Sequence, residues 1–206
     1  MIEVVRHVSR GFSCNTYLCR DEKSGKLLVI DPGTSAEEVL ALLSGEKPQK
    51  ILLTHAHFDH ALAAPALREA TGAKVCVHRA EAPLLADPEK NASSYFGFPP
   101  LSFEADVLLE DGEEILLGAS VFHVHHTPGH SPGGVCYRVD DLLFCGDTLF
   151  ADGVGRTDLF GGSKDALCSS IESLKALEGV VNAFPGHGES FLLSRRLAQE
   201  NLYFYG

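Results

Sequence analysis

The segment THAHFDH, residues 54–60, gathers three histidines and one aspartate within seven residues. Imidazole and carboxylate groups are costly to bury without partners, so a core is a poor explanation for them. The same groups bind zinc, iron and manganese in proteins, with the geometry deciding among the metals. The composition of the segment therefore predicts a metal site.

The neighbouring sequence indicates how these side chains are positioned. KILLT (50–54) predicts a buried strand that runs directly into the cluster, and a helix is expected to follow it. His55 and His57 then lie on the connecting loop, where both can reach one metal. Asp59 and His60 leave the first turn of the helix and can reach a second metal.

Three further candidate ligands each follow a predicted strand and are flanked by glycine. They are His130 in TPGHSPGG, Asp147 in CGDTLF and His187 in FPGHGE. Glycine allows a tight backbone geometry and a close approach to neighbouring groups. Together the five histidines and two aspartates make two complete ligand sets, and Asp147 is able to bridge them.

The remaining histidines are interpreted as structural. A histidine within a strand is more often a satisfied, partly buried residue than a ligand, and this applies to His7, His78, His123 and His125. His126, next to the TPGH loop, is expected to support that loop. Asp31, in VIDPG, is expected to shape a turn or to orient a ligand.

The elements around these motifs alternate between strand and helix patterns. Strands are predicted at 26–33, 50–54, 73–78, 105–109, 113–117, 120–126, 134–139, 142–146 and 181–184. Helices are predicted after a capping box formed by Ser35 and Glu38, after the histidine cluster, at 163–178 and at the C-terminus. Strand–helix units that flank a central block of strands are typical of an α/β protein whose sheets are covered by helices.

Composition limits the classes of protein and partner. The chain has 206 residues, of which 45% are hydrophobic and 22% charged, so we expect a single domain spanning residues 1–206. No apolar run reaches the length of a membrane span, and the N-terminus lacks the pattern of a signal peptide. We therefore expect a cytoplasmic protein without a membrane partner.

Charge and cysteine content further limit the possible partners and the state of the thiols. The formal net charge of −11 disfavours a nucleic-acid partner, because such proteins usually carry a basic face. The six cysteines form no CxxC pair, and we expect buried, reduced thiols. The sequence indicates nothing firm about the oligomeric state.

The ordered motifs resemble the metallo-β-lactamase superfamily, from about Gly11 to about Arg195. The resemblance implies a four-layer αββα sandwich with two divalent metal ions, zinc foremost and iron or manganese as alternatives, in a cleft at the sheet edges. It implies that the first metal is held by His55, His57 and His130, the second by Asp59, His60 and His187, and that Asp147 bridges them.

Within that superfamily, GVGRTDLFGG (153–162) is similar to the compact type of glyoxalase II, a hydroxyacylglutathione hydrolase. The resemblance implies a small-molecule acyl thioester substrate. A hydroxide shared by the metals would attack the acyl carbonyl, with Asp59 as the catalytic residue that holds it. Arg156 lies where larger glyoxalase II enzymes bind glutathione, although pairing with Asp158 explains it equally well.

Three alternatives remain open from the sequence. A persulfide dioxygenase of this family would use one iron and consume oxygen, and the complete second ligand set argues against it. A lactonase, phosphodiesterase or other ester hydrolase would share the fold. A metal-binding domain without catalysis would also satisfy the motifs, although every ligand position is filled.

Overall fold

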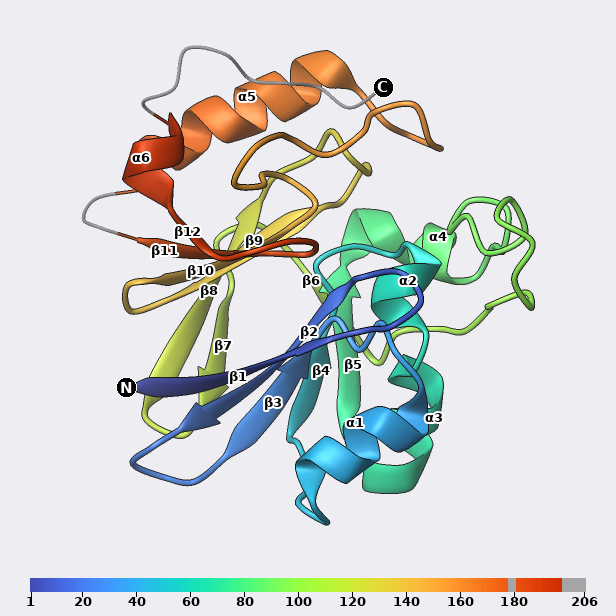
Figure 1. Ribbon diagram of the computed structural model, residues 1–206, viewed down its shortest axis with the longest axis vertical. Coiled ribbons are helices and arrows are strands. Elements are labelled where there is room, and N and C mark those ends of the chain that lie inside the picture. The colour runs from blue at the N-terminus through green and yellow to red at the C-terminus, as the bar shows by residue number, and fades with distance from the viewer. Residues whose placement is uncertain (178–180, 198–206) are drawn as a thin grey trace.

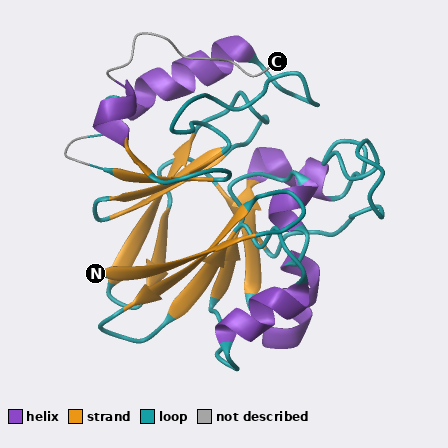
Figure 2. Ribbon diagram, viewed as in Figure 1, coloured by secondary structure: helices purple, strands orange, loops and turns teal. Residues whose placement is uncertain are grey.

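The computed structural model describes residues 1–177 and 181–197, which form four layers: helices, a sheet, a second sheet and helices (Figure 1). Figure 2 shows the two sheets face to face, with helices on both outer sides. This arrangement confirms the α/β sandwich. The last residue of the predicted helix 163–178 lies outside the described residues.

The first sheet combines an N-terminal antiparallel hairpin with parallel strands. Its spatial order is β1 (Ile2–Val8), β2 (Asn15–Asp21), β3 (Leu27–Ile30), β4 (Lys50–Leu52), β5 (Lys74–His78) and β6 (Val107–Leu109). The strands from β3 to β6 run parallel. Parallel strands need crossover connections. These carry α1 (Ala36–Leu43), α2 (Phe58–Ala61), α3 (Ala64–Thr71), the 3₁₀ turn η1 (Arg79–Glu81) and α4 (Ala82–Leu85).

The second sheet is mostly antiparallel. Its spatial order is β12 (Phe191–Leu192), β11 (Asn182–Pro185), β10 (Leu142–Gly146), β9 (Val135–Val139), β8 (Ser120–His126) and β7 (Glu114–Leu117). Only the pair of β10 and β11 is parallel within this described sheet. The helix α5 (Lys164–Leu174) and the short α6 (Leu193–Leu197) lie on its outer side (Figure 1).

Three apolar clusters separate the four layers. In β3, Leu28 and Ile30 face the second sheet, whereas Leu27 and Val29 face the helices on the other side. Because both faces are covered, this strand is a continuous apolar run instead of an alternating one. A third cluster joins β10 to Leu167 and neighbouring residues of α5.

The structure differs from the sequence prediction in two respects. The hairpin β1–β2 and the short β12 were not predicted. The helix after the cluster is also interrupted, and α3 begins near Pro65, which lacks the N–H that would continue the preceding helix.

The strand ends place the candidate ligands at one edge of the sandwich. The chain leaves β3, β4, β10 and β11 at this edge, which lies where the two sheets meet. An isolated bridge between Cys14 and His187 connects the N-terminal hairpin to the loop after β11. No helix among the described residues is long and apolar enough to cross a membrane.

Candidate metal centre

The first predicted ligand set converges into a compact group. His55 and His57, on the loop after β4, lie beside His130, on the loop between β8 and β9. One ligand nitrogen from each lies within 4.8 Å of the others. His57 Nδ1 is 2.9 Å from His130 Nε2, and all three side chains are buried. The spacing suits a single ion bound by three imidazoles.

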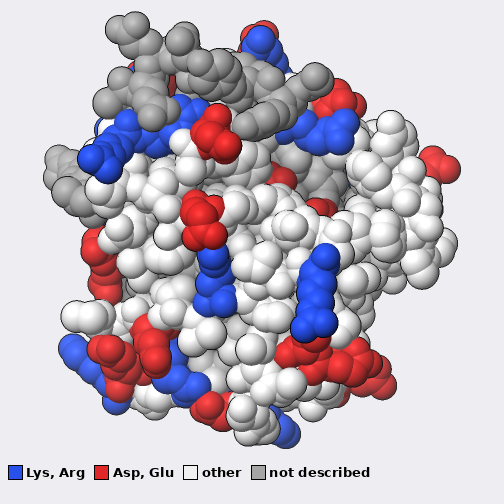
Figure 3. Space-filling model, in the orientation of Figure 1, with Lys and Arg blue, Asp and Glu red and all other residues white. Residues whose placement is uncertain are grey.

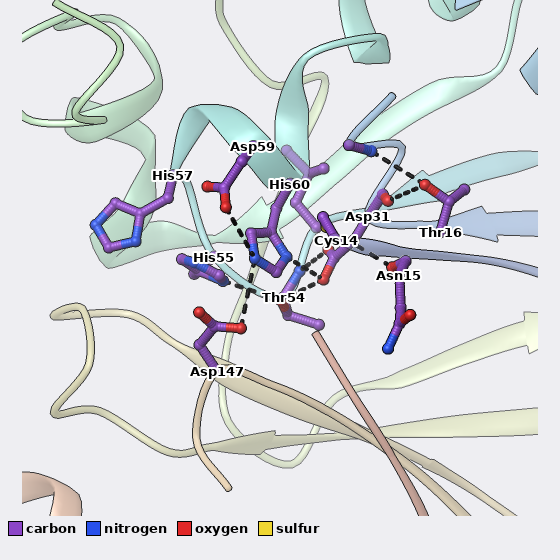
Figure 4. A network of polar contacts seen from close by, with 12 residues as sticks. Cys14, Asn15, Thr16, Asp31, Thr54, His55, His57, Asp59, His60 and Asp147 are labelled. Atoms are coloured by element: carbon purple, nitrogen blue, oxygen red, sulfur yellow. Dashed lines mark hydrogen bonds and ion pairs between the residues drawn. The ribbon is translucent and has the colours of Figure 1, made fainter. Parts of the chain in front are cut away.

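The second predicted set lies next to the first, and Figure 4 shows Asp147 beside His60 of the second set. His60 Nε2 is 3.3 Å from His187 Nε2, which is 3.4 Å from an oxygen of Asp59. The carboxylate of Asp147 is 3.4 Å from His60, 3.7 Å from His187 and 3.6 Å from His130. Asp147 therefore contacts histidines of both sets.

Two polar side chains behind the centre orient His55 and His60. Asp31 accepts hydrogen bonds from the Thr54 amide at 2.7 Å and the Thr54 hydroxyl at 2.6 Å, and from His60 Nδ1 at 2.9 Å (Figure 4). The Thr54 hydroxyl donates to Asp31, so its oxygen is left to accept from His55 Nδ1 at 3.1 Å. Both histidines thereby carry their proton on Nδ1 and leave Nε2 free as an acceptor.

Backbone carbonyls orient two more histidines in the same way. His130 Nδ1 donates to the carbonyl of Arg156 at 2.8 Å, and His187 Nδ1 donates to the carbonyl of Ser13 at 3.1 Å. A carbonyl only accepts, so both imidazoles keep a lone pair on Nε2. The Nε2 lone pairs of four histidines, from both ligand sets, are therefore available to a metal.

The chemistry of this donor set fits metal ions. His55 Nε2, His57 Nε2 and Asp147 Oδ1 are buried without a hydrogen-bond partner. Two acceptor nitrogens, on His60 and His187, face each other at 3.3 Å. Two imidazole acceptors in such contact are unfavourable unless a proton or a metal ion lies between them. The residues therefore fit two divalent ions, and nitrogen and oxygen donors suit zinc and iron alike.

The two sets differ in their electrostatics. Burial lowers the pKa of His55 and His130, and it lowers the pKa of His57 to about 3. Burial also acts on His60 and His187, but neighbouring groups outweigh it and raise the pKa of both histidines. These groups are Cys14, Asp147, Asp59 and Asp31 at His60, and Asp147 and Asp59 at His187. In the metal-free protein, protons therefore bind the second set at higher pH than the first.

This difference predicts which metal leaves first on acidification. Protons compete with a metal for a histidine once the pH falls below the pKa of that metal-free ligand. As the pH falls from about 8 to about 5, we expect the second set to lose zinc before the first. Zinc content is measured after dialysis at stepped pH for His130→Ala, which keeps the second set, and His187→Ala, which keeps the first. We expect His130→Ala to lose half of its zinc at a higher pH than His187→Ala. The opposite order would contradict the assignment of these histidines to the two ligand sets.

Glu81 is a supporting residue that the sequence did not reveal. Its carboxylate is fully buried and accepts the backbone N–H of Ala56 at 2.8 Å and of Gly133 at 2.6 Å. It thereby ties the loop of His55 and His57 to the loop of His130. Its sequence context, RAEAPLL, indicates only a short helix.

Replacing Glu81 tests this connection. In Glu81→Gln one carboxylate oxygen becomes an NH₂ group, so one buried backbone N–H loses its acceptor. We expect a loss of about 1–3 kcal/mol in the free energy of unfolding. We also expect about 10–100-fold weaker zinc binding, as for other groups that support metal ligands. Denaturant unfolding measures the free energy of unfolding, and zinc competition titration measures the zinc affinity. Glu69→Gln, at an exposed position on α3, is the control. Unchanged zinc affinity would show that Glu81 does not position the first set.

The other sequence-based assignments are placed as follows. The guanidinium of Arg156 binds Asp158 through two contacts of 2.6 and 2.7 Å, while it also lines the cavity above the ligands. The hydrogen bond from His130 to the backbone carbonyl of Arg156 was not predicted from the sequence.

Cys14 lies against His60 and His187, and burial raises the pKa of its thiol to about 12. All six cysteines are free, and all are buried as expected except Cys168, which is half-buried.

The histidines interpreted as structural lie away from the described metal groups. His7, His78, His123, His125 and His126 belong to none of these groups. His126 stacks on His78 with ring centroids 4.2 Å apart, and its Nε2 is 3.2 Å from the carbonyl of Pro132. His126 thus supports the loop that carries His130.

A cavity of about 330 Å³ opens above the ligands. Its floor consists of His57, Asp59, His130, Asp147 and His187, which belong to both ligand sets. The side chain of Asp59 is 20% exposed, whereas that of His60 is fully buried. A molecule in the cavity would therefore reach Asp59 and the metal positions directly, and it would not touch His60.

Comparison with known proteins supports this picture. Probable metallo-hydrolase YqgX of Bacillus subtilis is 40% identical over 167 residues, covering 78% of this chain and 79% of that protein. The hydroxyacylglutathione hydrolase of Pseudomonas aeruginosa is 35% identical over 176 residues, covering 83% of this chain but 60% of that protein.

Solved structures agree with these relatives. BLEG-1 B3 metallo-β-lactamase superposes with a TM-score of 0.89 at 34% identity, covering 96% of this chain and 97% of that chain. The di-iron-bound form of TTHA1623 superposes with a TM-score of 0.80 at 36% identity, covering 93% of this chain and 96% of that chain. The sequence profile of the metallo-β-lactamase superfamily matches residues 9–187. The chain is therefore a metallo-hydrolase that belongs to the metallo-β-lactamase superfamily.

Proposed function

We propose that the protein is a dinuclear metal-dependent thioester hydrolase of the hydroxyacylglutathione hydrolase type. The observation that carries the proposal is the pair of complete ligand sets, joined by Asp147, at the floor of an open cavity. The similarity to the Pseudomonas aeruginosa hydroxyacylglutathione hydrolase supports the thioester as substrate.

Two bound divalent ions would supply hydroxide at neutral pH and polarise an acyl carbonyl. The protein's own residues hold these groups in place. Asp147 contacts both histidine sets, and Asp31, Thr54 and two carbonyls fix the imidazole tautomers. Burial opposes ionisation of Asp59, but His60 and His187 outweigh it and lower its pKa. Asp59 therefore reaches the cavity as a carboxylate, which can bind a metal and accept a hydrogen bond. A thiolate leaves without a strong acid, so this site requires none.

The test is hydrolysis of S-lactoylglutathione by the purified protein, with metal content determined on the same sample. Efficient turnover with about two metals per chain would support the proposal. Two metals without turnover of S-lactoylglutathione or of any other acyl glutathione would overturn thioester specificity and direct the search to lactones and other esters. A single iron with oxygen consumption would favour a persulfide dioxygenase instead.

A second candidate activity is β-lactam hydrolysis, because BLEG-1 is described as a B3 metallo-β-lactamase and is 34% identical to this chain. A chromogenic cephalosporin assayed on the same metal-loaded sample distinguishes the two. A kcat/KM for the cephalosporin above that for S-lactoylglutathione would identify β-lactam hydrolysis as the preferred activity.

A further inference from the structure

The cavity above the metal ligands has an apolar wall that the metal chemistry does not require. Phe12, Phe58, Phe96, Phe98, Ala92 and Leu159 form this wall. We propose that it is an acyl-binding pocket, and that the preferred substrates carry an apolar acyl group, aromatic or branched, in place of a small hydroxyacyl group such as lactoyl. This inference rests on the proposed thioesterase function.

The four phenylalanine rings form one continuous surface. Phe12 meets Phe58 and Phe98 edge-on, with centroids 5.0 and 4.7 Å apart, and Phe58 stacks on Phe98 at 4.9 Å. Phe58 belongs to α2, directly beside the ligand Asp59. The apolar surface therefore begins at the metal ligands. A ring on the substrate can add to it in the stacked or edge-on arrangements that aromatic groups favour.

The wall is partly exposed, although its groups are apolar. Phe58 is 3% exposed, but Phe96 is 46% and Phe98 37% exposed. Figure 3 shows that the lobe on the right, which Figure 1 identifies as the segment after α4, is largely uncharged. An apolar surface that lines a concave site is the usual mark of a ligand-binding wall.

The segment that carries Phe96 and Phe98 is held in place by hydrogen bonds. The amide of Phe98 donates to the carbonyl of Ser93 at 2.9 Å, and that of Phe96 to the carbonyl of Ala92 at 3.1 Å. The amide of Phe58 donates to the carbonyl of Asn91 at 3.0 Å, which couples this segment to α2. The aromatic wall is therefore preformed relative to the ligands, and this reduces the entropy lost on binding.

The charges around the cavity favour an apolar acyl group over an anionic one. Among the described residues that line the cavity, Arg156 is the only Lys or Arg, and its guanidinium is bound to both oxygens of Asp158. A carboxylate on the acyl group would have to displace that pair. A charged thiol such as glutathione can extend to solvent, whereas the acyl group next to the reacting carbonyl can be enclosed. The cavity, about 330 Å³, is at the small end of ligand sites.

The experiment keeps the thiol constant and changes the acyl group. S-lactoyl-, S-acetyl- and S-phenylacetylglutathione are hydrolysed by the zinc-loaded protein, and kcat/KM is determined for each. We expect phenylacetyl to exceed both others by about 10-fold or more, because small changes of apolar contact in a pocket have effects of this size. Equal values, or a preference for lactoyl, would overturn the proposal.

Variants locate the preference within the protein. Phe98→Ala should reduce the phenylacetyl-to-acetyl ratio of kcat/KM by about 10-fold. Phe160→Ala is the matched control, since Phe160 is 52% exposed on a neighbouring loop and does not line the cavity. The ratio is measured within each protein, so partial misfolding does not change it. An unchanged ratio in Phe98→Ala would contradict the assignment.

Binding of the product acids separates this inference from the thioesterase proposal. Calorimetry with phenylacetate and acetate on the zinc-loaded protein requires no turnover. Binding of phenylacetate about 10-fold tighter than acetate, without hydrolysis of any thioester, would keep the pocket and discard the thioesterase. Equal binding, together with equal hydrolysis of all three thioesters, would keep the thioesterase and discard the pocket.

Discussion

Asp147→Asn is expected to abolish the dinuclear centre while the chain remains folded. The carboxylate lies 3.4 to 3.7 Å from ring nitrogens of His60, His130 and His187, and its Oδ1 has no hydrogen-bond partner. The amide keeps the shape of the side chain but removes the charge and one of the oxygens that bind metal. Since metal stabilisation of the transition state amounts to several kcal/mol, we expect kcat/KM to fall about 10³-fold or more.

Metal analysis and circular dichroism on the same samples complete this test. Zinc content should fall from about two to about one per chain or less, because Asp147 is shared by both sets. Asp152→Asn, an exposed carboxylate on the following loop, is the matched control and should retain both metals. Full zinc content with full activity in Asp147→Asn would refute the role of Asp147 as bridging ligand.

The candidate ligands could be predicted from the sequence because each is marked locally. His55, Asp147 and His187 follow apolar strands, and polar groups at the ends of buried strands collect at the edge of a sheet. The strand pattern of the central block was confirmed for the same reason, since an apolar run bounded by glycine or turn residues depends on few distant contacts. The order of the motifs, rather than their periodicity, indicated the four layers.

Most of the groups that orient the metal ligands could not be predicted from the sequence. His130 and His187 are oriented by the carbonyls of Arg156 and Ser13, and every residue has a carbonyl. Glu81 acts through a fold that brings Ala56 and Gly133 together, and sequence spacing does not show this. Asp31 was identified only because VIDPG marks a turn after a strand.

The outer strand β1 of the N-terminal hairpin was missed for a different reason. An outer strand that is only partly covered retains a weak alternation, and Val5 and Val8 of β1 are 45% and 42% exposed. The aromatic wall was equally hidden, because Phe12 lies far in sequence from Phe58 and Phe98. Only the folded chain brings these rings within about 5 Å of one another.

Gly186→Ala is expected to disrupt the centre without removing any ligand. A Cβ at this position would lie 2.2 Å from Asp147 Oδ1 and 2.5 Å from His60 Cε1. The backbone has no room to retreat, because the amide of Gly186 donates to Gly146 at 2.8 Å and its carbonyl accepts from the amide of Asn15 at 2.7 Å. Asp147 and His60 must therefore move, and a displacement of about 1 Å lowers catalytic rates about 10²-fold.

The effect of Gly186→Ala on stability is expected to be smaller than its effect on the metals. Overpacking of this kind lowers the free energy of unfolding by about 1–3 kcal/mol, so the variant should fold. Zinc titration of the folded variant measures the loss of metal affinity, and thioester hydrolysis measures the loss of catalytic rate. Gly11→Ala is the control, since a Cβ there meets nothing within 4 Å and the backbone needs no left-handed conformation. If Gly186→Ala bound two zinc ions with unchanged affinity, His60 and Asp147 would not share a metal. The glycines beside the ligands would then serve only the turns in which they lie.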